Sequence, residues 1–298
     1  MRVTFNSLHE NSVRNVQTAA GQLAEAQRQV SSGKRISRPS DDPSAAAGSL
    51  ASRAELATVS RYEQAADSVY SRLTVIDTVL SDVVSKLTQA ETAAMSARGS
   101  SKSQAQREAA AQELDGIRSA LLDDFNAAFN GVYLFAGTRS TTRPYNQQAN
   151  GSVDPYAGST TEMQVDVNRQ TAVTVVYDGS RITQGGAAQD VFAVIDDLMT
   201  AARNGDDDAL GNGMAAIRAA FDRATAAQSR VGAGMVAIDG ERTRLGEMHR
   251  AAQSQISKFE DANMAEAISS MNHADTAYRA ALGAVSTANK VSLLDYLG

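Results

Sequence analysis

The chain has 298 residues, of which 43% are hydrophobic and only 5% aromatic, a composition that suits long Ala-rich helices better than a large mixed core. The formal net charge of −6 and the pI near 5.2 exclude a general electrostatic attraction to nucleic acid, and no apolar run approaches a membrane span. The absence of cysteine excludes disulfides, thiolate catalysis and Cys-based zinc sites.

The first segment predicts a helix over residues 6–30 with a thin apolar stripe. Val16, Leu23 and Val30 recur there at seven-residue spacing, and small alanines fill the intermediate positions. This stripe has little to bury against within its own length. Residues 1–10 hold no apolar signal-peptide core, so we expect any export to bypass the general secretory signal.

A helix stop and a constrained loop follow. Ser31-Ser32-Gly33 ends the helix, and Pro39 and Pro43 restrict the backbone between them. Asp42 is expected to cap the next helix, with Pro43 at its first position.

This loop resembles the N-terminal signature of the flagellin superfamily. The run Ser-Ser-Gly-Lys-Arg-Ile at 31–36, then Arg-Pro-Ser-Asp-Asp-Pro at 38–43 and Ala-Ala at 45–46, has the form typical of the superfamily's hook–filament junction members. Filament flagellins usually carry an apolar residue after the Ser-Ser-Gly and no such pair of prolines. The resemblance implies that residues 31–46 form an assembly surface, with Arg35 and Arg38 as candidate contacts.

The next segment carries a coiled-coil seam. Apolar residues alternate there at steps of four and three, and polar residues lie between them. The seam residues are Tyr62, Ala66, Val69, Leu73, Ile76, Leu80, Val83, Leu87, Ala90 and Ala94. A helix of this length needs a partner of matching length.

A second helix is expected from about Ser103 to Asn126, after a turn at Arg98-Gly99-Ser100. The run Tyr-Leu-Phe-Ala-Gly-Thr at 133–138 follows it and is again similar to the junction members of the superfamily. From Thr138 to Gly186 the residue period changes to two, and Met163, Val165 and Val167 followed by Val173, Val175 and Tyr177 predict a β-hairpin that turns at Asn168-Arg169-Gln170.

The second half of the chain supplies the partner of the seam. An Ala-rich helix is expected from Ala188 to Arg203, and the residues Asp206 to Asp208 open a long return helix. The three-four alternation recurs at Met214, Ile217, Phe221, Ala224, Gln228, Val231, Met235, Ile238, Arg242, Leu245, His249, Ala252, Ile256 and Phe259. We therefore expect a mainly α fold: a long antiparallel coiled-coil rod formed by both chain halves, with a small β-rich domain inserted at its far end.

The alternation slips by one residue across Glu260-Asp261-Ala262-Asn263, which rotates the apolar stripe and predicts a domain boundary. The expected domains are terminal assembly helices (1–30 with 264–298), a coiled-coil rod (31–130 with 188–263) and a β-rich insert (131–187). Because the terminal arms bury few large apolar groups, we expect them to fray or remain largely disordered in the free monomer and to become helical on assembly.

No catalytic, cofactor or metal site is predicted, and an enzyme is not expected. His9, His249 and His273 lie far apart in sequence, and Asp206 to Asp208 suit a helix cap better than a calcium loop. The candidate assembly-interface residues are Val16, Leu23, Val30, Arg35, Arg38, Met264, Ile268, Met271, Tyr278, Leu282, Val285, Leu293, Leu294 and Leu297.

The resemblance implies an exported structural subunit of the bacterial flagellum, outside the cell at the hook–filament junction. It implies as partners a ring of identical subunits, the first hook-associated protein, flagellin and an export chaperone on the C-terminal arm, and it implies export without a cleaved signal peptide. No nucleic acid or membrane partner is expected. Two alternatives remain open from the residues: the filament flagellin itself, and a soluble signalling coiled coil, which would explain the seam but neither the β insert nor the terminal arms.

Overall fold

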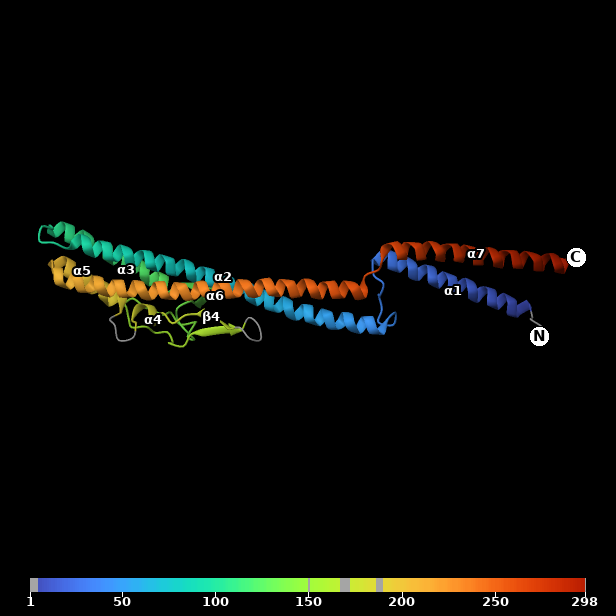
Figure 1. The fold of residues 1–298 in the computed structure, drawn as a ribbon, viewed down its shortest axis with the longest axis horizontal. Coiled ribbons are helices and arrows are strands. Elements are labelled where there is room, and N and C mark those ends of the chain that lie inside the picture. Colours follow the sequence, from blue (N-terminus) through green and yellow to red (C-terminus); the bar gives the residue numbers. More distant parts are fainter. Residues whose placement is uncertain (1–4, 150, 167–171, 186–189, 298) are drawn as a thin grey trace. The chain divides into compact units, whose positions relative to one another are not determined.

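The computed structural model describes residues 5–149, 151–166, 172–185 and 190–297, with side chains described within 10–287. The elements, in chain order and as labelled in Figure 1, are α1 (Phe5–Ser32), α2 (Pro43–Ala97), α3 (Gln104–Phe125), β1 (Ala128–Phe129), β2 (Val132–Tyr133), β3 (Met163–Asp166), β4 (Ala172–Val176), α4 (Ser180–Thr183), α5 (Val191–Asn204), α6 (Asp207–Glu260) and α7 (Met264–Leu297). The mainly α class with small antiparallel sheets is confirmed.

The chain divides into two compact units. Unit 1 comprises residues 1–60 and 247–298, and unit 2 comprises residues 61–246. Helices α2 and α6 each contribute to both units. The three-part domain division drawn from the sequence stays a prediction.

Within unit 2, α2 and α6 run antiparallel. Arg242 Nε donates to Asp67 Oδ1 at 2.7 Å near one end of the pair, and the backbone N–H of Gly99 donates to Asp207 Oδ1 at 2.9 Å near the other. Between these contacts, an atom of Leu73 lies 3.5 Å from the position that a Cβ on Gly234 would occupy. Leu73 therefore faces the return helix, as the sequence predicts.

Both predicted apolar stripes are turned inward. On α2, nine of the ten seam residues are buried, and only Tyr62 is partly exposed. On α6, each seam residue is buried or half-buried, including the polar Gln228, Arg242 and His249. The knobs-into-holes packing of a coiled coil stays a prediction, but the residues that would form it are those removed from water.

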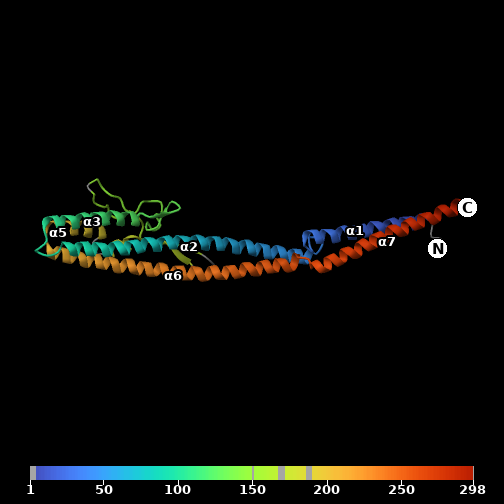
Figure 2. The ribbon, with the colours of Figure 1, turned by 90° about the horizontal axis from the view of Figure 1, so that it is seen from above.

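Helices α3 and α5 pack against each other and lie beside α2 and α6 in the same unit (Figure 2). Ser103 and Gln106 form the capping box that begins α3, and Asp190 caps α5 by accepting from the N–H of Phe192. Gly205 ends α5 in the left-handed conformation, with φ 67°, which favours glycine. Asp206 then accepts from the backbone of Asp208 and Ala209, so the predicted cap of the return helix is confirmed.

The predicted hairpin is confirmed as β3 and β4, which pair antiparallel with Val165 opposite Val173. Val167 and the expected turn residues 168–170 lie outside the described residues, as does the expected start of the next helix at Ala188. The β1–β2 pair was not predicted, because two-residue strands carry no readable period.

The position of the β-rich insert differs from the sequence expectation. Val173 lies close to Gly234, and Arg223 Nε donates to the Ile182 carbonyl at 2.8 Å, so the insert lies alongside α6 and not beyond the helix ends. The reason is α3, which turns back along α2 before the insert begins. Lys86 Nζ on α2 donates to Asp124 Oδ2 near the end of α3 at 2.6 Å.

A cluster of aromatic rings forms the core of the insert. Phe135 and Tyr145 of the insert meet Phe125 of α3 and Phe192 of α5, with ring centroids 5.1 to 6.1 Å apart and mostly edge-to-face. Tyr145 is fully buried, and its hydroxyl shares a 2.7 Å hydrogen bond with Thr183. The insert is therefore packed onto the helices through shared side chains.

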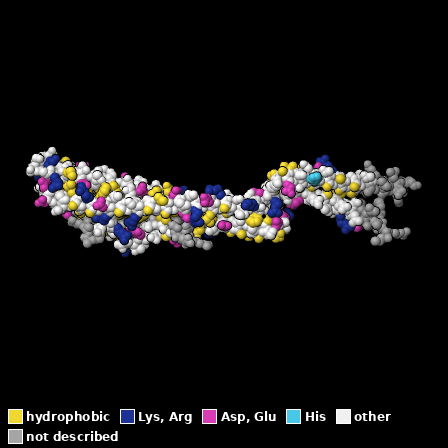
Figure 3. Space-filling view, viewed as in Figure 1, with side chains coloured by type: hydrophobic (Ala, Val, Ile, Leu, Met, Phe, Trp, Pro, Cys, Tyr) yellow, Lys and Arg dark blue, Asp and Glu magenta, His cyan; other side chains and the backbone are white. Residues whose placement is uncertain are grey.

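Within unit 1, α1 packs against α7. Among the side chains described on these two helices, Ala19 and Ala26 are buried on α1 and Ala267 is buried on α7. Within the described part of the chain, none of the helices combines the length and hydropathy needed to cross a bilayer. On the face in view in Figure 3, acidic and basic side chains are interspersed along the molecule.

Candidate functional site

The loop at the centre of the predicted assembly surface (residues 31–46) connects α1 to α2 and is held against the short connection between α6 and α7. The N–H of Ala262 donates to the Gly33 carbonyl at 2.9 Å, and the N–H of Arg35 donates to the Glu260 carbonyl at 2.6 Å. Gly33, the helix-stopping residue, has φ 69°, a left-handed conformation that favours glycine. Two segments more than 200 residues apart thus meet through their backbones.

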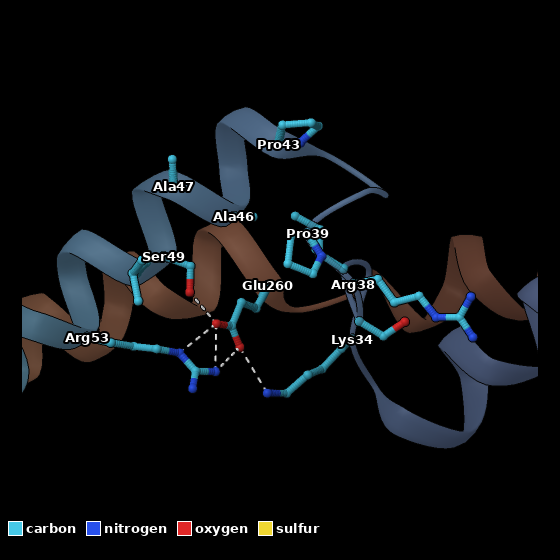
Figure 4. A pocket seen from close by; sticks show the side chains of 12 residues that line it. Lys34, Arg38, Pro39, Pro43, Ala46, Ala47, Ser49, Arg53 and Glu260 are labelled. Carbon is cyan, nitrogen blue, oxygen red and sulfur yellow. Dashed lines mark hydrogen bonds and ion pairs between the residues drawn. The ribbon is translucent and has the colours of Figure 1, made fainter.

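Glu260, the last residue of α6, is the centre of a side-chain cluster in this place (Figure 4). Arg53 Nε and Nη2 donate to its carboxylate at 2.9 and 2.7 Å, and Lys34 Nζ donates at 2.9 Å. The hydroxyl of Ser49 donates to the same carboxylate. The carboxylate is nearly buried, so these partners replace the water that it loses.

These contacts favour the charged form of the carboxylate. The hydrogen bonds from Arg53, then those from Ser49 and Lys34, lower the pKa of Glu260 from 4.5 to about 2. Glu260 therefore carries its charge throughout the neutral range and joins the loop, α2 and α6 by ionic hydrogen bonds.

Two aspartates fix the turn of the loop. Asp41 accepts from the N–H groups of Arg38 and Ser37 at 2.8 and 3.1 Å, and these bonds lower its pKa. Asp42 accepts from the N–H of Ala45 at 3.0 Å, which confirms it as the cap of α2. This bond is the main reason that the pKa of Asp42 falls to about 2.

Gly48 allows α2 and the end of α6 to approach closely. A Cβ at this position would lie 2.7 Å from Cζ of the Phe259 ring, which is too short for a carbon–carbon contact. The ring therefore packs directly on the backbone of α2, one residue before Ser49. Ser49 and Glu260, which directly follow Gly48 and Phe259, therefore lie within hydrogen-bonding distance of each other.

An open groove of about 560 Å³ lies over the cluster. Its apolar lining comes from the loop and the first turns of α2, and Leu50 there is 70% exposed. Figure 4 shows Pro39, Pro43 and Ala46 along the loop and helix, with Arg38 pointing away from Glu260. The groove, with its lining from residues 34–53 and Glu260, is a candidate contact surface of unit 1 and is called the loop groove below.

The two arginines singled out from the sequence differ in the structure. Arg35 is exposed but is used within the chain, donating to Asp42 at 3.2 Å and to the Phe259 carbonyl at 3.1 Å. Arg38 is exposed, and among the described residues its guanidinium forms no hydrogen bond or ion pair. Arg38 is therefore the better candidate for a contact with another molecule.

The candidate residues of the terminal helices fall into three groups. Val16, Leu23 and Val30 of α1 are half-buried, as are Met271, Tyr278 and Val285 of α7, whereas Met264, Ile268 and Leu282 are exposed at 42 to 44%. The side chains of Leu293, Leu294 and Leu297 lie outside the described residues. The predicted stripe of α7 is thus divided between a half-buried set and an exposed set. Their assembly role stays a prediction.

The sequence reasoning missed the Glu260 cluster. It placed a boundary at the slip across residues 260–263, and α6 does end at Glu260 with α7 beginning at Met264. It gave no signal that Glu260 would meet Lys34 and Arg53, because their separations of 226 and 207 residues leave no local pattern. Only the register between α2 and α6 would have revealed the cluster, and the seven-residue repeat leaves that register open.

Replacing Glu260 by glutamine should make the chain less stable at neutral pH and remove part of its acid sensitivity. Hydrogen bonds to charged groups contribute about 1 to 3 kcal/mol, and the amide cannot accept from Arg53 and Lys34 as a carboxylate does. Because the folded-state pKa lies below the unfolded value of 4.5, this stability is full above that value and is lost as the pH falls toward about 2.

Urea denaturation followed by circular dichroism would measure this difference. The gap between the parent and Glu260→Gln chains should be present at neutral pH and close near pH 2. A gap that does not change with pH would mean that the carboxylate's charge is not what holds the loop.

The described residues bring no three His, Asp or Glu side chains together in a way that could hold a metal ion. The loop groove combines apolar side chains with three basic side chains and the carboxylate of Glu260. That arrangement can bind a surface of another macromolecule.

Two family descriptions match the chain. The bacterial flagellin N-terminal helical region matches residues 3–140, and the bacterial flagellin C-terminal helical region matches residues 214–297. Together they take in about three quarters of the chain. The loop groove contains residues from both matched regions.

Two curated relatives are called flagellar hook-associated protein 3. The one from Salmonella typhimurium is 26% identical over 61% of this chain and 56% of its own length, and the one from Escherichia coli is 24% identical over 67% and 66%. The matches thus span less than two thirds of either relative. Among solved structures, Xanthomonas campestris FlgL has a TM-score of 0.62 at 20% identity, covering 68% of this chain and 98% of that chain, which shows a shared fold.

Proposed function

This chain belongs to the bacterial flagellin family, and from that premise we propose that it is a structural subunit of the flagellum that joins the hook to the flagellin filament. The observation that carries the proposal is the match of both helical regions together with relatives named as hook-associated. The loop sequence at 31–46 and the run at 133–138, both of the junction form, favour this role over that of the filament subunit.

The proposed partners are further copies of the chain, the first hook-associated protein, flagellin and an export chaperone on the C-terminal arm. The proposed location is outside the cell, at the hook–filament junction, after export without a cleaved signal peptide. The proposed role is purely structural and needs no catalytic site. The fold shared with FlgL supports this reading over a soluble signalling coiled coil.

The proposal can be tested by locating the chain in the bacterium of origin. Purified flagella should contain the chain, and gold-labelled antibody should mark the boundary between hook and filament. A strain lacking the chain should assemble hooks and shed its flagellin into the medium. Labelling along the whole filament would instead identify a filament subunit, and recovery in the cytosol alone would contradict both flagellar roles.

Reversing the charge of Arg38 (Arg38→Glu) should leave thermal unfolding of the monomer unchanged and abolish motility. The guanidinium forms no hydrogen bond or ion pair among the described residues and acts within the chain only as the smallest of the causes that lower the pKa of Asp41, so the reversal changes chiefly what Arg38 offers to another molecule. Arg35→Glu is a less clean test, since it also breaks the contacts to Asp42 and Phe259.

Arg143→Glu, at an exposed arginine of the insert, is the matched control and should remain motile. Swimming in soft agar and calorimetry of the purified chains give the two readouts. A motile Arg38→Glu strain would refute a contact role for this residue.

A further inference from the structure

Asparagine is followed by glycine at three places where the structure describes both residues. Asparagine in this setting is chemically labile, because glycine has no side chain to keep its backbone nitrogen away from the preceding amide. All three asparagines are exposed to solvent. The pairs are Asn130-Gly131, Asn204-Gly205 and Asn212-Gly213. Since sequence and exposure are shared, the pairs differ in the backbone around the glycine nitrogen.

Two of the glycine nitrogens are held in helical hydrogen bonds. The N–H of Gly205 donates to the Ala202 carbonyl at 3.3 Å in the last turn of α5. Gly213 lies in the second turn of α6, where its N–H donates along the helix, and a Cβ there would lie 2.5 Å from a methyl carbon of Leu198. Neither nitrogen can approach the preceding side chain unless the helix opens locally.

Asn130 and Gly131 form the two-residue turn between β1 and β2. Their φ angles of 51° and 77° are both left-handed, as a tight hairpin turn of this length requires. Among the described residues, neither the N–H of Gly131 nor the side-chain amide of Asn130 forms a hydrogen bond. A Cβ on Gly131 would meet no atom within 4 Å. The two reacting groups are therefore adjacent, unbonded and free to move together.

We propose that Asn130 is a site of spontaneous deamidation and that the reaction loosens the turn between β1 and β2. The nitrogen of Gly131 forms a bond to Cγ of Asn130, the bond from Cγ to the side-chain nitrogen breaks, and ammonia leaves with the proton of the former N–H. Water then opens the cyclic imide at one of its two carbonyl carbons, and the Gly131 nitrogen regains a proton. Opening at Cγ gives aspartate, and opening at the backbone carbonyl carbon gives isoaspartate.

Both products change the place where the insert meets α2. Each adds a negative charge next to Phe129, whose ring centroid lies 5.6 Å from the guanidinium carbon of Arg72. Isoaspartate also lengthens the main chain within the turn, which a two-residue connection cannot absorb while Phe129 stays opposite Val132. The reaction belongs to the chain itself and does not depend on the proposed flagellar role.

Mass spectrometry of the purified chain, held warm at mildly alkaline pH, tests the reaction. The tryptic peptides 119–139 and 204–218 contain the three pairs, and their fragment spectra locate each new acidic residue. In the folded chain, Asn130 should convert at least about tenfold faster than Asn204 or Asn212, because the helical nitrogens react only after local opening. In urea all three should convert at similar rates.

Two outcomes would overturn the assignment. One is a folded chain in which Asn130 converts no faster than the two helical asparagines. The other is the same tenfold ranking in urea, since the fold would then not be its cause. Asn126 is a control within the first peptide and should stay unconverted, because its side-chain amide donates to the Tyr145 carbonyl at 2.9 Å.

Hydrogen exchange tests the loosening of the turn. The N–H of Leu134 donates to the Ala127 carbonyl at 3.0 Å, directly beyond the paired residues of β1 and β2. This amide should exchange faster in the aged parent than in the fresh parent. The variant Asn130→Gly has no amide to lose and keeps the left-handed turn, so ageing should not change its exchange. Equal exchange in the aged and fresh parent, once Asn130 has converted, would overturn the loosening.

Discussion

Replacing Leu80 by alanine should lower the free energy of unfolding by about 2 to 5 kcal/mol. Leu80 lies in the middle of the α2 seam and is fully buried, so the shorter side chain leaves a cavity between helices that cannot close freely. Ser85→Ala, on the same helix at an exposed position, should change stability by no more than about 0.5 kcal/mol.

Urea denaturation of the two variants, followed by circular dichroism, gives the comparison directly. Both substitutions yield alanine in the middle of one long helix, so they differ in side-chain packing far more than in the helix propensity of the new residue. Equal losses in the two variants would show that the buried stripe of α2 has been assigned to the wrong residues.

Deleting residues 289–298 should abolish attachment to flagella and leave unit 2 as stable as in the parent. The deleted segment belongs to α7, which leaves Met264, Ile268 and Leu282 partly exposed in a single chain. Covering such a side chain contributes about 1.5 to 3 kcal/mol, whereas ordering each backbone residue costs about 1 to 2 kcal/mol. We therefore expect the terminal helices to gain their full stability only when neighbouring subunits cover them.

Hydrogen exchange on the dilute monomer measures how stable the terminal helices are in a single chain. Amides of residues 264–287 should exchange rapidly, and those of residues 66–94 should be protected, because the latter belong to the fully buried seam. Strong protection of α7 in the monomer would mean that the arm is already folded before assembly, and the coupling of order to assembly would be refuted.

The sequence predicted the helices well because their signals are local and repeated. The seam of α2, the cap at Asp42 and the restart at Met264 each follow from spacing or from a single cap residue. The lateral position of the insert and the pairing of Glu260 with Arg53 could not be read in this way. Both depend on which turn of one helix meets which turn of another, and a seven-residue repeat fits several registers equally well.

The sequence predicted the loop of the candidate site but not the contacts that its side chains make. A family signature placed the loop on the surface and drew attention to Arg35 and Arg38. Only the structure distinguishes the two arginines. Arg35 donates hydrogen bonds to Asp42 and to the Phe259 carbonyl, whereas the side chain of Arg38 points away from Glu260. The exposed side of α7 likewise depends on where α1 packs, which no periodicity in α7 alone determines.

The aromatic cluster limits how evolution or an engineer can exchange the insert. Phe125 and Phe192 belong to the helices, while Phe135 and Tyr145 belong to the insert, and all four rings share one core. A graft from a relative must bring side chains that refill this core, or the ends of α3 and α5 lose their packing. The hairpin of β3 and β4 includes none of these rings, but Val173, Val175 and Val176 of β4 are buried as well, so a graft must also match the packing of this strand.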